Sequence, residues 1–597
     1  MRMKVSDYIA SYLVDYGISQ VFSVTGGGAI HLNDSIGRAA ELNVLYNHHE
    51  QACAIAAESY ARIHGKVALC CVTTGPGGTN TITGVLGGWL DSVPMLIISG
   101  QVRYDTTVRS TGLNLRAMGD QEFDITKSVS SMTKYCEMVT DPKRIKYCLE
   151  KALYIATSGR PGPCWLDIPL NIQGAYIDTD TLKGYNEEKH DIPSPVDEQT
   201  IEEIIGILRQ SERPVLYAGN GINAANARAE FINTVETLGI PVVTTWNGID
   251  LVQDNHPLYI GRGGIMGDRA GNFAVQNSDL VIAIGNRLSI RQVGYNWKTW
   301  ARAAKVIMCD ADLDEMKKPT LHVDMPVWCD AKDLLHKLSN ANFSKTYEND
   351  WLETCTNWKK KYPVVLQKHY DDKQTNVYAF IKELSKRLPS GKTTVVGNGS
   401  ACVVGSHAYE IKEDSRFIIN SGVASMGYDL PAAIGAHCAS GEEIICITGD
   451  GSIQMNLQEL QTIVHHNMPI KIFVINNGGY SSIRQTQDNL FNCNYTGVGY
   501  DSGDLSFPDM DKIAQAYGIS FARCDKNADL PDFLDNVLNV DGAVIAEVIV
   551  SKSQVFEPKS ATKKLENGTL FSPPLEDLAP FLDRSEFESN MIIPIIK

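Results

Sequence analysis

One stretch of the chain, from Gly449 to Asn477, gathers residue types that can hold a metal-bound diphosphate. Asp450 offers a carboxylate, Asn477 a side-chain carbonyl oxygen, and Gly479, just beyond, a backbone carbonyl oxygen. Mg²⁺ prefers such hard oxygen ligands in octahedral geometry, together with the phosphates of a substrate or cofactor. Taken separately, Gly-Asp-Gly is an ordinary turn and Asn-Asn an ordinary loop. Because each directly follows an apolar run, together they predict a magnesium–diphosphate site.

Two buried strands and a helix would position these residues. The apolar runs 444–447 and 470–475 indicate strands, and the helical pattern between them ends before Pro469. In an open parallel sheet, ligands bind at the carboxyl ends of the strands. Gly451 lets the chain approach the phosphates closely, and Ser452 offers a hydroxyl and a backbone N–H at the start of the helix.

A second candidate, Glu50, lies between a strand pattern at 44–47 and an Ala-rich helical pattern at 52–61. An acidic residue at the start of a helix can simply complement the helix dipole. The alternative is a carboxylate that takes part in general acid–base catalysis within a pocket. This position alone leaves both interpretations open.

Composition is typical of a globular enzyme, with 43% hydrophobic and 21% charged residues among 597. The net charge of −16 and the lack of a basic cluster argue against a nucleic-acid or membrane partner. No uncharged apolar run is long enough to span a membrane, and the start of the chain indicates an amphipathic helix rather than a signal peptide. The 14 cysteines include no Cys-x-x-Cys pair, so we expect a cytoplasmic, reduced protein.

Alternating strand and helix patterns predict an α/β fold with parallel sheets covered on both faces. We expect three doubly wound parallel-sheet domains and a tail. A polar stretch around 181–198, with Pro-Ser-Pro at 193–195, separates the first two domains, and a charged helical connection at 346–372 separates the second from the third. The predicted limits are 1–185, 199–345 and 373–555 for the domains and 556–597 for the tail.

As far as about residue 550, the chain resembles the acetolactate synthase branch of the thiamine-diphosphate (ThDP) enzymes. The resemblance implies ThDP and Mg²⁺ as cofactors, and a pyrimidine-binding, a central and a diphosphate-binding domain in that order. It also implies a homodimer or homotetramer whose active site forms between subunits. The matching strings are GGG at 26–28, HHEQ at 48–51, TTGPGGTN at 73–80, LDSVPMLIISGQV at 90–102, SGRPGPCWLDIP at 158–169, MGYDLPAAIGA at 426–436 and the GDG…NN unit.

The resemblance also implies roles for single residues. Glu50 would hydrogen-bond N1′ of the pyrimidine ring, which favours the imino form that removes the thiazolium C2 proton. Met426 would bend ThDP into its V shape, and the backbone carbonyl of Ala424 would accept from the 4′-amino group. Gln121 matches a glutamine near the reaction centre, with a surface-helix residue as its alternative interpretation. The other residues expected to contact the cofactor are Asn80, Gly399, Ser400, Asp450, Gly451, Ser452, Asn477, Gly479 and Tyr480.

Three departures from the family pattern bear on the reaction. Synthases carry a tryptophan in the place of Thr486, so the smaller side chain leaves room for a larger acceptor. Flavin-containing synthases show Asp-Asp-Arg where this chain has Leu288–Gly294 and keeps only Arg291, which leaves FAD binding open. The histidines of simple pyruvate- and benzoylformate-type decarboxylases are absent near 113–121 and 73–75, which favours transfer to a second carbonyl compound.

We therefore expect decarboxylation of a 2-oxoacid, pyruvate first among them, with transfer of the acyl group to an acceptor carbonyl. The tail resembles that of synthase-like proteins linked with polysaccharide biosynthesis, so a keto-sugar is one expected acceptor. A ThDP-dependent decarboxylase or lyase without carboligation is the alternative. A non-catalytic ThDP-binding protein is a third hypothesis, and the intact Glu50, Asp450 and Asn477 argue against it.

Overall fold

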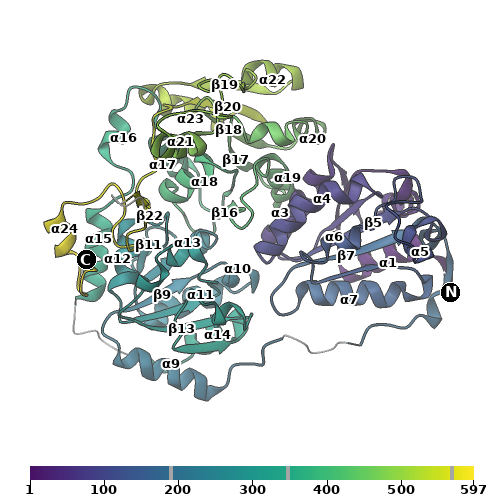
Figure 1. The fold of residues 1–597 in the computed structure, drawn as a ribbon, viewed down its shortest axis with the longest axis horizontal. Coiled ribbons are helices and arrows are strands. Elements are labelled where there is room, and N and C mark those ends of the chain that lie inside the picture. Colours follow the sequence, from purple (N-terminus) through teal and green to yellow (C-terminus); the bar gives the residue numbers. More distant parts are fainter. Residues whose placement is uncertain (187–191, 344–349, 565–569, 597) are drawn as a thin grey trace.

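A computed structural model describes residues 1–186, 192–343, 350–564 and 570–596. Three six-stranded parallel sheets follow one another along the chain, and helices cover both faces of each (Figure 1). The predicted α/β fold of three doubly wound domains is confirmed.

The N-terminal sheet consists mainly of short apolar strands, most of them buried, as expected for a parallel sheet covered on both faces. One face packs against α1 (Val5–Tyr16), α2 (Ile30–Arg38) and α7 (Ile145–Thr157), and the other against α3 (Glu50–His64) and α4 (Pro76–Leu90). The strand order reverses between β2 and β4, which creates a topological switch point there. The order is β3 (Asn43–Tyr46), β2 (Gln20–Ser23), β4 (Leu69–Val72), β5 (Met95–Gln101), β7 (Pro163–Pro169) and β6 (Tyr135–Met138).

The central sheet is also doubly wound but has a different strand order, with its switch point between β9 and β12. Helices α9 (Glu198–Gln210), α11 (Arg228–Leu238) and α14 (Ala331–Ser339) cover one face, and α12 (Arg269–Asn277) and α15 (Trp351–Lys361) cover the other. The strand order is β11 (Tyr259–Arg262), β10 (Val242–Thr244), β9 (Pro214–Ala218), β12 (Leu280–Ile284), β13 (Lys305–Asp310) and β14 (Met325–Trp328).

The third sheet has the same strand order as the first and carries the Gly-Asp-Gly turn at its switch point, between β15 and β17. Helices α17 (Val377–Arg387), α18 (Ser400–Ala408) and α23 (Leu530–Leu538) cover one face, and α19 (Asp429–Ser440) and α20 (Glu459–His465) cover the other. The strand order is β16 (Arg416–Ile419), β15 (Thr393–Val396), β17 (Ile444–Gly449), β18 (Ile470–Asn476), β20 (Val544–Ile549) and β19 (Ser520–Cys524).

Helices α3 and α19 pack against each other and join the first and third domains into one continuous hydrophobic core (Figure 1). A buried ion-pair network reinforces this contact. Arg62 pairs with Glu58 and, at 2.7 Å, with Asp91, while Glu58 accepts a hydrogen bond from Tyr428 of the third domain at 2.8 Å. Breaking a buried pair leaves an uncompensated charge, so this network holds the two domains in one arrangement.

The C-terminal tail, yellow in Figure 1, lies across the central domain. Its described residues include one short α-helix, α24 (Arg584–Ser589). Asn590 Oδ1 accepts from the indole N–H of Trp358 at 3.0 Å, and the backbone N–H of Ile592 donates to Asn277 Oδ1 at 2.8 Å. The tail therefore covers the outer face formed by α12 and α15.

Some local details differ from the sequence-based expectations. A 3₁₀ turn, Ile453–Asn456, precedes α20, so the helix expected directly after Ser452 starts later. The two predicted connections between domains lie partly outside the described residues, at 187–191 and 344–349. Within the described part of the chain, no helix combines the length and the apolar character needed to cross a membrane. All 14 cysteines are free thiols.

Candidate functional site

Asp450 lies at the carboxyl end of β17 and is 2% exposed. Its carboxylate oxygens accept hydrogen bonds from the backbone N–H groups of Gly451 at 3.0 Å and Gly479 at 2.9 Å. Burial raises the pKa of Asp450 to about 7, although these N–H donors act to lower it. Asp450 forms no ion pair with any described residue, so its negative charge is available to a bound cation.

Asn477, directly after β18, presents a second oxygen to the same region. Its Nδ2 donates to Ser400 Oγ at 3.2 Å, and Ser400 Oγ lies 3.0 Å from Ser481 Oγ. Asn477 Oδ1 is buried and has no hydrogen-bond partner among the described residues. Buried polar atoms are almost always paired, so an orphaned amide oxygen near a buried carboxylate suits a cation site.

The backbone around these side chains is shaped by glycines and an aromatic ring. A Cβ at Gly479, whose φ is +135°, would lie 1.9 Å from the carbonyl oxygen of Val498. A Cβ at Gly451 would lie 2.3 Å from the ring of Tyr480, so that ring covers the Gly-Asp-Gly turn. Larger residues at either glycine would force this loop apart.

The described residues contain no group of three or more His, Cys, Asp or Glu side chains placed to hold a metal ion. A cation at Asp450 would therefore depend on one carboxylate, the Asn477 amide oxygen and the Gly479 carbonyl, completed by ligand oxygens. This set fits Mg²⁺, which is usually held by one or two carboxylates and substrate phosphates rather than by an all-protein cage.

Ser400 is the first residue of α18, and Gly399 before it has a φ of +71°, a conformation that glycine adopts without strain. This helix start lies at the carboxyl end of β15, on the other side of the switch point from Asp450. Backbone N–H groups and the helix dipole make such a terminus suited to an anion. The predicted diphosphate contacts from these two segments thus meet at one sheet edge.

The Ser452 hydroxyl makes hydrogen bonds to other residues of the protein. Its Oγ donates to Asp429 Oδ2 at 2.7 Å and accepts from the backbone N–H of Gly427 at 3.0 Å. The hydroxyl therefore fixes the loop that carries Met426, a contribution that the sequence did not predict. Met426 itself is half-buried at the end of this loop.

Ala424, in the same loop, has a φ of +53°, which is costly for a residue with a side chain. Its carbonyl oxygen accepts a hydrogen bond from Asn398 Nδ2. A carbonyl oxygen has two lone pairs, so this bond leaves room for a second donor. Asn398 was missed by the sequence reasoning, because nothing local connects it to a loop 26 residues away.

Glu50 is the first residue of α3, half-buried, and its Oε2 accepts from Asn80 Nδ2 at 2.9 Å. The adjacent Gln51 docks on the third domain, where its Oε1 accepts from Asn456 Nδ2 at 2.9 Å. Within the described chain, no hydrogen bond connects the Glu50 side chain to the cluster at Asp450. The structure thus brings Glu50 and Asn80 together.

Gln121 and Thr486 are both exposed. Gln121 lies in a loop with a φ of +59°, so its alternative interpretation as a surface-helix residue is wrong. Thr486 lies on α21 (Ser481–Phe491), where its hydroxyl donates to the Ser482 carbonyl at 3.0 Å. Thr486 is therefore on the exposed side of this helix and does not pack in the core.

Comparisons with known proteins identify the three domains. Three family models match in domain order: the N-terminal TPP binding domain of thiamine pyrophosphate enzymes at 3–127, the central domain at 201–338 and the C-terminal TPP binding domain at 397–548. The acetolactate synthase large subunit of Cyanidium caldarium is 32% identical over 92% of this chain and 94% of its own length. The chain belongs to the thiamine pyrophosphate enzyme family.

Other relatives within this family carry related names. The chloroplastic acetolactate synthase of Arabidopsis thaliana is 33% identical over 92% of this chain and 81% of its own length. The large subunit from Lactococcus lactis subsp. lactis is 31% identical over 92% and 93%, respectively. The recognition of an acetolactate synthase-like ThDP enzyme from sequence motifs is confirmed.

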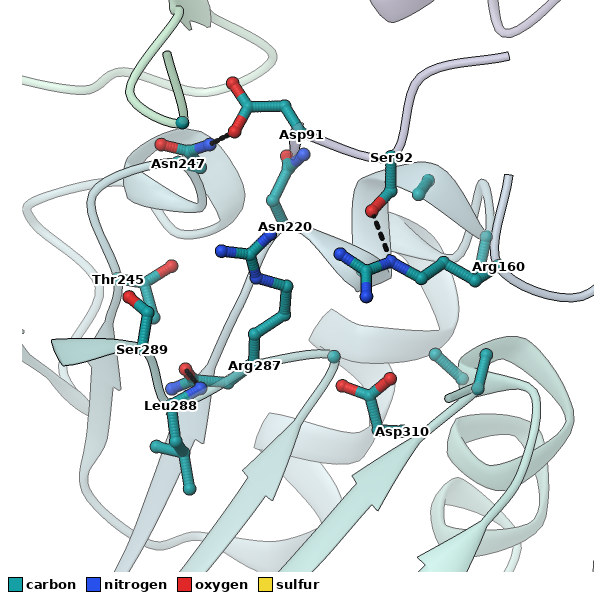
Figure 2. A pocket seen from close by; sticks show the side chains of 18 of the residues that line it. Asp91, Ser92, Arg160, Asn220, Thr245, Asn247, Arg287, Leu288, Ser289 and Asp310 are labelled. Carbon is teal, nitrogen blue, oxygen red and sulfur yellow. Dashed lines mark hydrogen bonds between the residues drawn. The ribbon is translucent and has the colours of Figure 1, made fainter. Parts of the chain in front are cut away.

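This thiamine pyrophosphate enzyme has a further pocket, with a cavity volume of about 620 Å³, at the switch point of its central sheet (Figure 2). Residues of all three domains line it. Arg160 enters from the N-terminal domain and Arg287 and Asp310 from the central domain, at the ends of β12 and β13. Burial raises the pKa of Asp310 to about 6. Two buried donors in the wall, Trp246 Nε1 and Asn286 Nδ2, have no partner among the described residues.

Proposed function

We propose that this enzyme decarboxylates a 2-oxoacid, pyruvate first among them, and transfers the acyl group to an acceptor carbonyl. The main support is the orphaned Asn477 Oδ1 beside the buried, unpaired carboxylate of Asp450, at the switch point where a diphosphate would bind. The named activity of the acetolactate synthase relatives supports the reaction type.

The third domain would hold the cofactor through its diphosphate. Asp450, Asn477 and the Gly479 carbonyl would ligate Mg²⁺, and the N-terminus of α18 at Ser400 would receive phosphate oxygens. The Tyr480 ring, which packs closely against Gly451, would cover the Gly-Asp-Gly turn. ThDP, when bound, supplies the carbon nucleophile that takes up the acyl group.

Glu50 would hold a proton at N1′ of the pyrimidine, because its carboxylate is aimed by the hydrogen bond from Asn80. Ala424 would accept from the 4′-amino group on the lone pair that Asn398 leaves free, and Met426 would support the bent cofactor from the same loop. Gln121 would contact the substrate from its exposed loop. A ThDP-dependent decarboxylase without carboligation would use the same groups.

Product analysis separates these two activities. Purified protein with ThDP and Mg²⁺ is given pyruvate alone, and then pyruvate with a panel of carbonyl acceptors that includes nucleotide keto-sugars. Mass spectrometry of a ligated product carrying the acyl group supports transfer. Release of aldehyde alone, with every acceptor unchanged, would establish the simple decarboxylase instead.

We also propose that the active site forms between two copies of the chain, in a homodimer or homotetramer. The support in the structure is an exposed apolar surface beside the Asp450 cluster. Helix α21, next to this cluster, exposes the apolar side chains of Ile483, Leu490 and Phe491, which a second copy can cover.

Mixing two inactive chains tests this arrangement. Chains with Glu50→Gln and chains with Asp450→Ala are unfolded together and refolded, so that hybrid dimers form. One of the two sites in each hybrid then has both native residues, and random pairing restores about a quarter of the wild-type activity in a two-fold dimer. Glu50→Gln chains refolded alone are the control. Persistent inactivity of a mixture shown to contain hybrids would place both residues in one chain's site.

The central pocket is proposed as an FAD site. Its volume suits a cofactor, Arg160 and Arg287 can bind a diphosphate, and Asp310 can accept from ribose hydroxyls. The unpaired Trp246 and Asn286 donors fit a polar ligand. A visible flavin spectrum of the purified protein supports this site, and a colourless protein that binds no added FAD would refute it.

For the acceptor, we propose a carbonyl compound larger than pyruvate, such as a keto-sugar. Thr486→Trp should lower transfer to a large acceptor and leave pyruvate decarboxylation intact, because an indole fills space that only the acceptor uses. Thr486→Ser is the matched control, since it keeps the hydroxyl bond to Ser482. Initial rates with several acceptors measure the effect. An unaltered acceptor profile in Thr486→Trp would show that this position is remote from the acceptor.

A further inference from the structure

Three buried polar side chains form a hydrogen-bonded network across neighbouring strands of the N-terminal sheet. Asp167 of β7 and Gln101 of β5 are at most 1% exposed, and Thr74, after β4, is 5% exposed. Asp167 Oδ2 accepts from Gln101 Nε2 at 3.0 Å, and Thr74 Oγ1 donates to Gln101 Oε1 at 2.7 Å. The proposed cofactor contacts use none of these three side chains.

The Gln101 amide is fully satisfied in one orientation. Its Nε2 donates to Asp167 and, at 2.7 Å, to the carbonyl of Phe123, while its Oε1 accepts from Thr74 and from the Val102 N–H at 3.1 Å. Turning the amide over would set its oxygen against two acceptors and its nitrogen against a backbone donor. The network therefore fixes this side chain, as fully paired buried polar groups do.

The groups that Gln101 holds belong to the loop of Gln121. Phe123, whose carbonyl it binds, is two residues further along. Thr74 Oγ1 lies 3.5 Å from the carbonyl of Gln121, and a Cβ at Gly75 would approach that carbonyl to 2.6 Å. Since Gln121 has a φ of +59°, the surrounding contacts must maintain its conformation.

Asp167 anchors the other end of this hydrogen-bond network, and its burial costs stability. Its Oδ1 accepts from Ser99 Oγ at 2.6 Å, and Ser99 Oγ accepts from the Trp165 indole N–H at 2.8 Å. Burial raises the pKa of Asp167 to about 7, and the side chain forms no ion pair with a described residue. Burying a carboxylate without a cation costs stability. Proteins keep such costly groups mainly where they serve a function.

We propose that Gln101 is a positioning residue. Asp167 fixes the orientation of its amide, and the amide in turn holds the loop that presents Gln121 to the substrate. This inference rests on the proposed function for the role of Gln121. It adds a constraint from inside the domain: the Gln101 amide holds the loop at the backbone carbonyl of Phe123, and Gln101 also positions Thr74, which lies next to the carbonyl of Gln121.

Gln101→Leu removes all four hydrogen bonds at nearly constant volume and tests the proposal. The yield of ligated product relative to released aldehyde should fall by roughly a hundredfold, the scale expected when a catalytic group is misplaced by about 1 Å. The Kd of ThDP with Mg²⁺ should stay within about twofold of the wild-type value, since the diphosphate contacts lie in another domain. Hydrogen exchange in the loop 119–125 should accelerate. Gln20→Leu, a buried glutamine at the opposite end of the sheet, is the matched control.

A double variant distinguishes positioning from general damage. If Gln101 acts through Gln121, then Gln101→Leu combined with Gln121→Ala is no worse than Gln121→Ala alone. Additive losses, or unchanged exchange in the loop, would overturn the proposal. If Gln101→Leu fails to fold, Thr74→Val compared with Thr74→Ser repeats the test at the other end of the amide. If the wild type makes no ligated product, the proposed function fails, and loop exchange alone still decides the role of Gln101.

Discussion

Glu50→Gln protein folds normally, binds ThDP with nearly unchanged affinity, and turns over roughly a hundred- to ten-thousandfold more slowly than the wild type. The reason is chemical rather than steric. Glutamine can still accept from Asn80 through its amide oxygen, so the start of α3 and its packing on α19 are retained. It cannot take up and return a proton at N1′, so activation of the cofactor slows.

Steady-state turnover and calorimetric ThDP binding, measured on the same preparation, check this expectation. Glu41→Gln is the control, because Glu41 is exposed in the same domain and has no proposed role. Wild-type turnover in Glu50→Gln would refute the assignment. A parallel loss of ThDP affinity would instead make Glu50 a binding residue.

Asp450→Ala abolishes the magnesium dependence of ThDP binding and weakens that binding by about a hundredfold or more, because it removes the only formal negative charge among the proposed protein ligands. The effect on the cofactor-free protein is different. Burial disfavours the ionised Asp450 carboxylate, so its removal should leave the melting temperature of that form unchanged or higher.

Two measurements separate these effects. Saturating Mg²⁺ and ThDP should raise the melting temperature of the wild type, since a ligand at a hundred times its Kd contributes about 2.7 kcal/mol. The same additions should not stabilise Asp450→Ala, whereas the exposed control Asp541→Ala should respond like the wild type. Magnesium-dependent binding of normal strength in Asp450→Ala would remove this residue from the site.

The sequence predicted the parts of the site that local pattern encodes. Asp450 and Asn477 each directly follow an apolar strand, and parallel strands bring such positions to one edge. The alternation of strand and helix patterns along the sequence likewise predicted three doubly wound parallel sheets. Glu50 was found for a similar reason, because the strand and the helix on either side of it are both clear in the pattern.

Contacts between distant segments could not be predicted in this way. Asn398 donates a hydrogen bond to the carbonyl of Ala424, and the Ser452 hydroxyl donates one to Asp429. Both bonds depend on side-chain directions that the periodicity of the sequence does not specify. The bond from Thr74 to Gln101 likewise depends on the register between two strands. For the central pocket, the sequence indicated only the segment 288–294, because the rest of the wall combines residues from three domains.

The core shared by α3 and α19 also has a consequence for how the protein is made. Every residue from Ala52 to Ala61 is buried, partly by a helix that begins only at Asp429. During synthesis, the N-terminal domain leaves the ribosome with this alanine-rich face uncovered, and several hundred residues must follow before its partner appears. At about 5–20 residues per second, that interval lasts tens of seconds. The nascent chain therefore carries an exposed apolar face for that time, which makes it a substrate for chaperones that bind such surfaces.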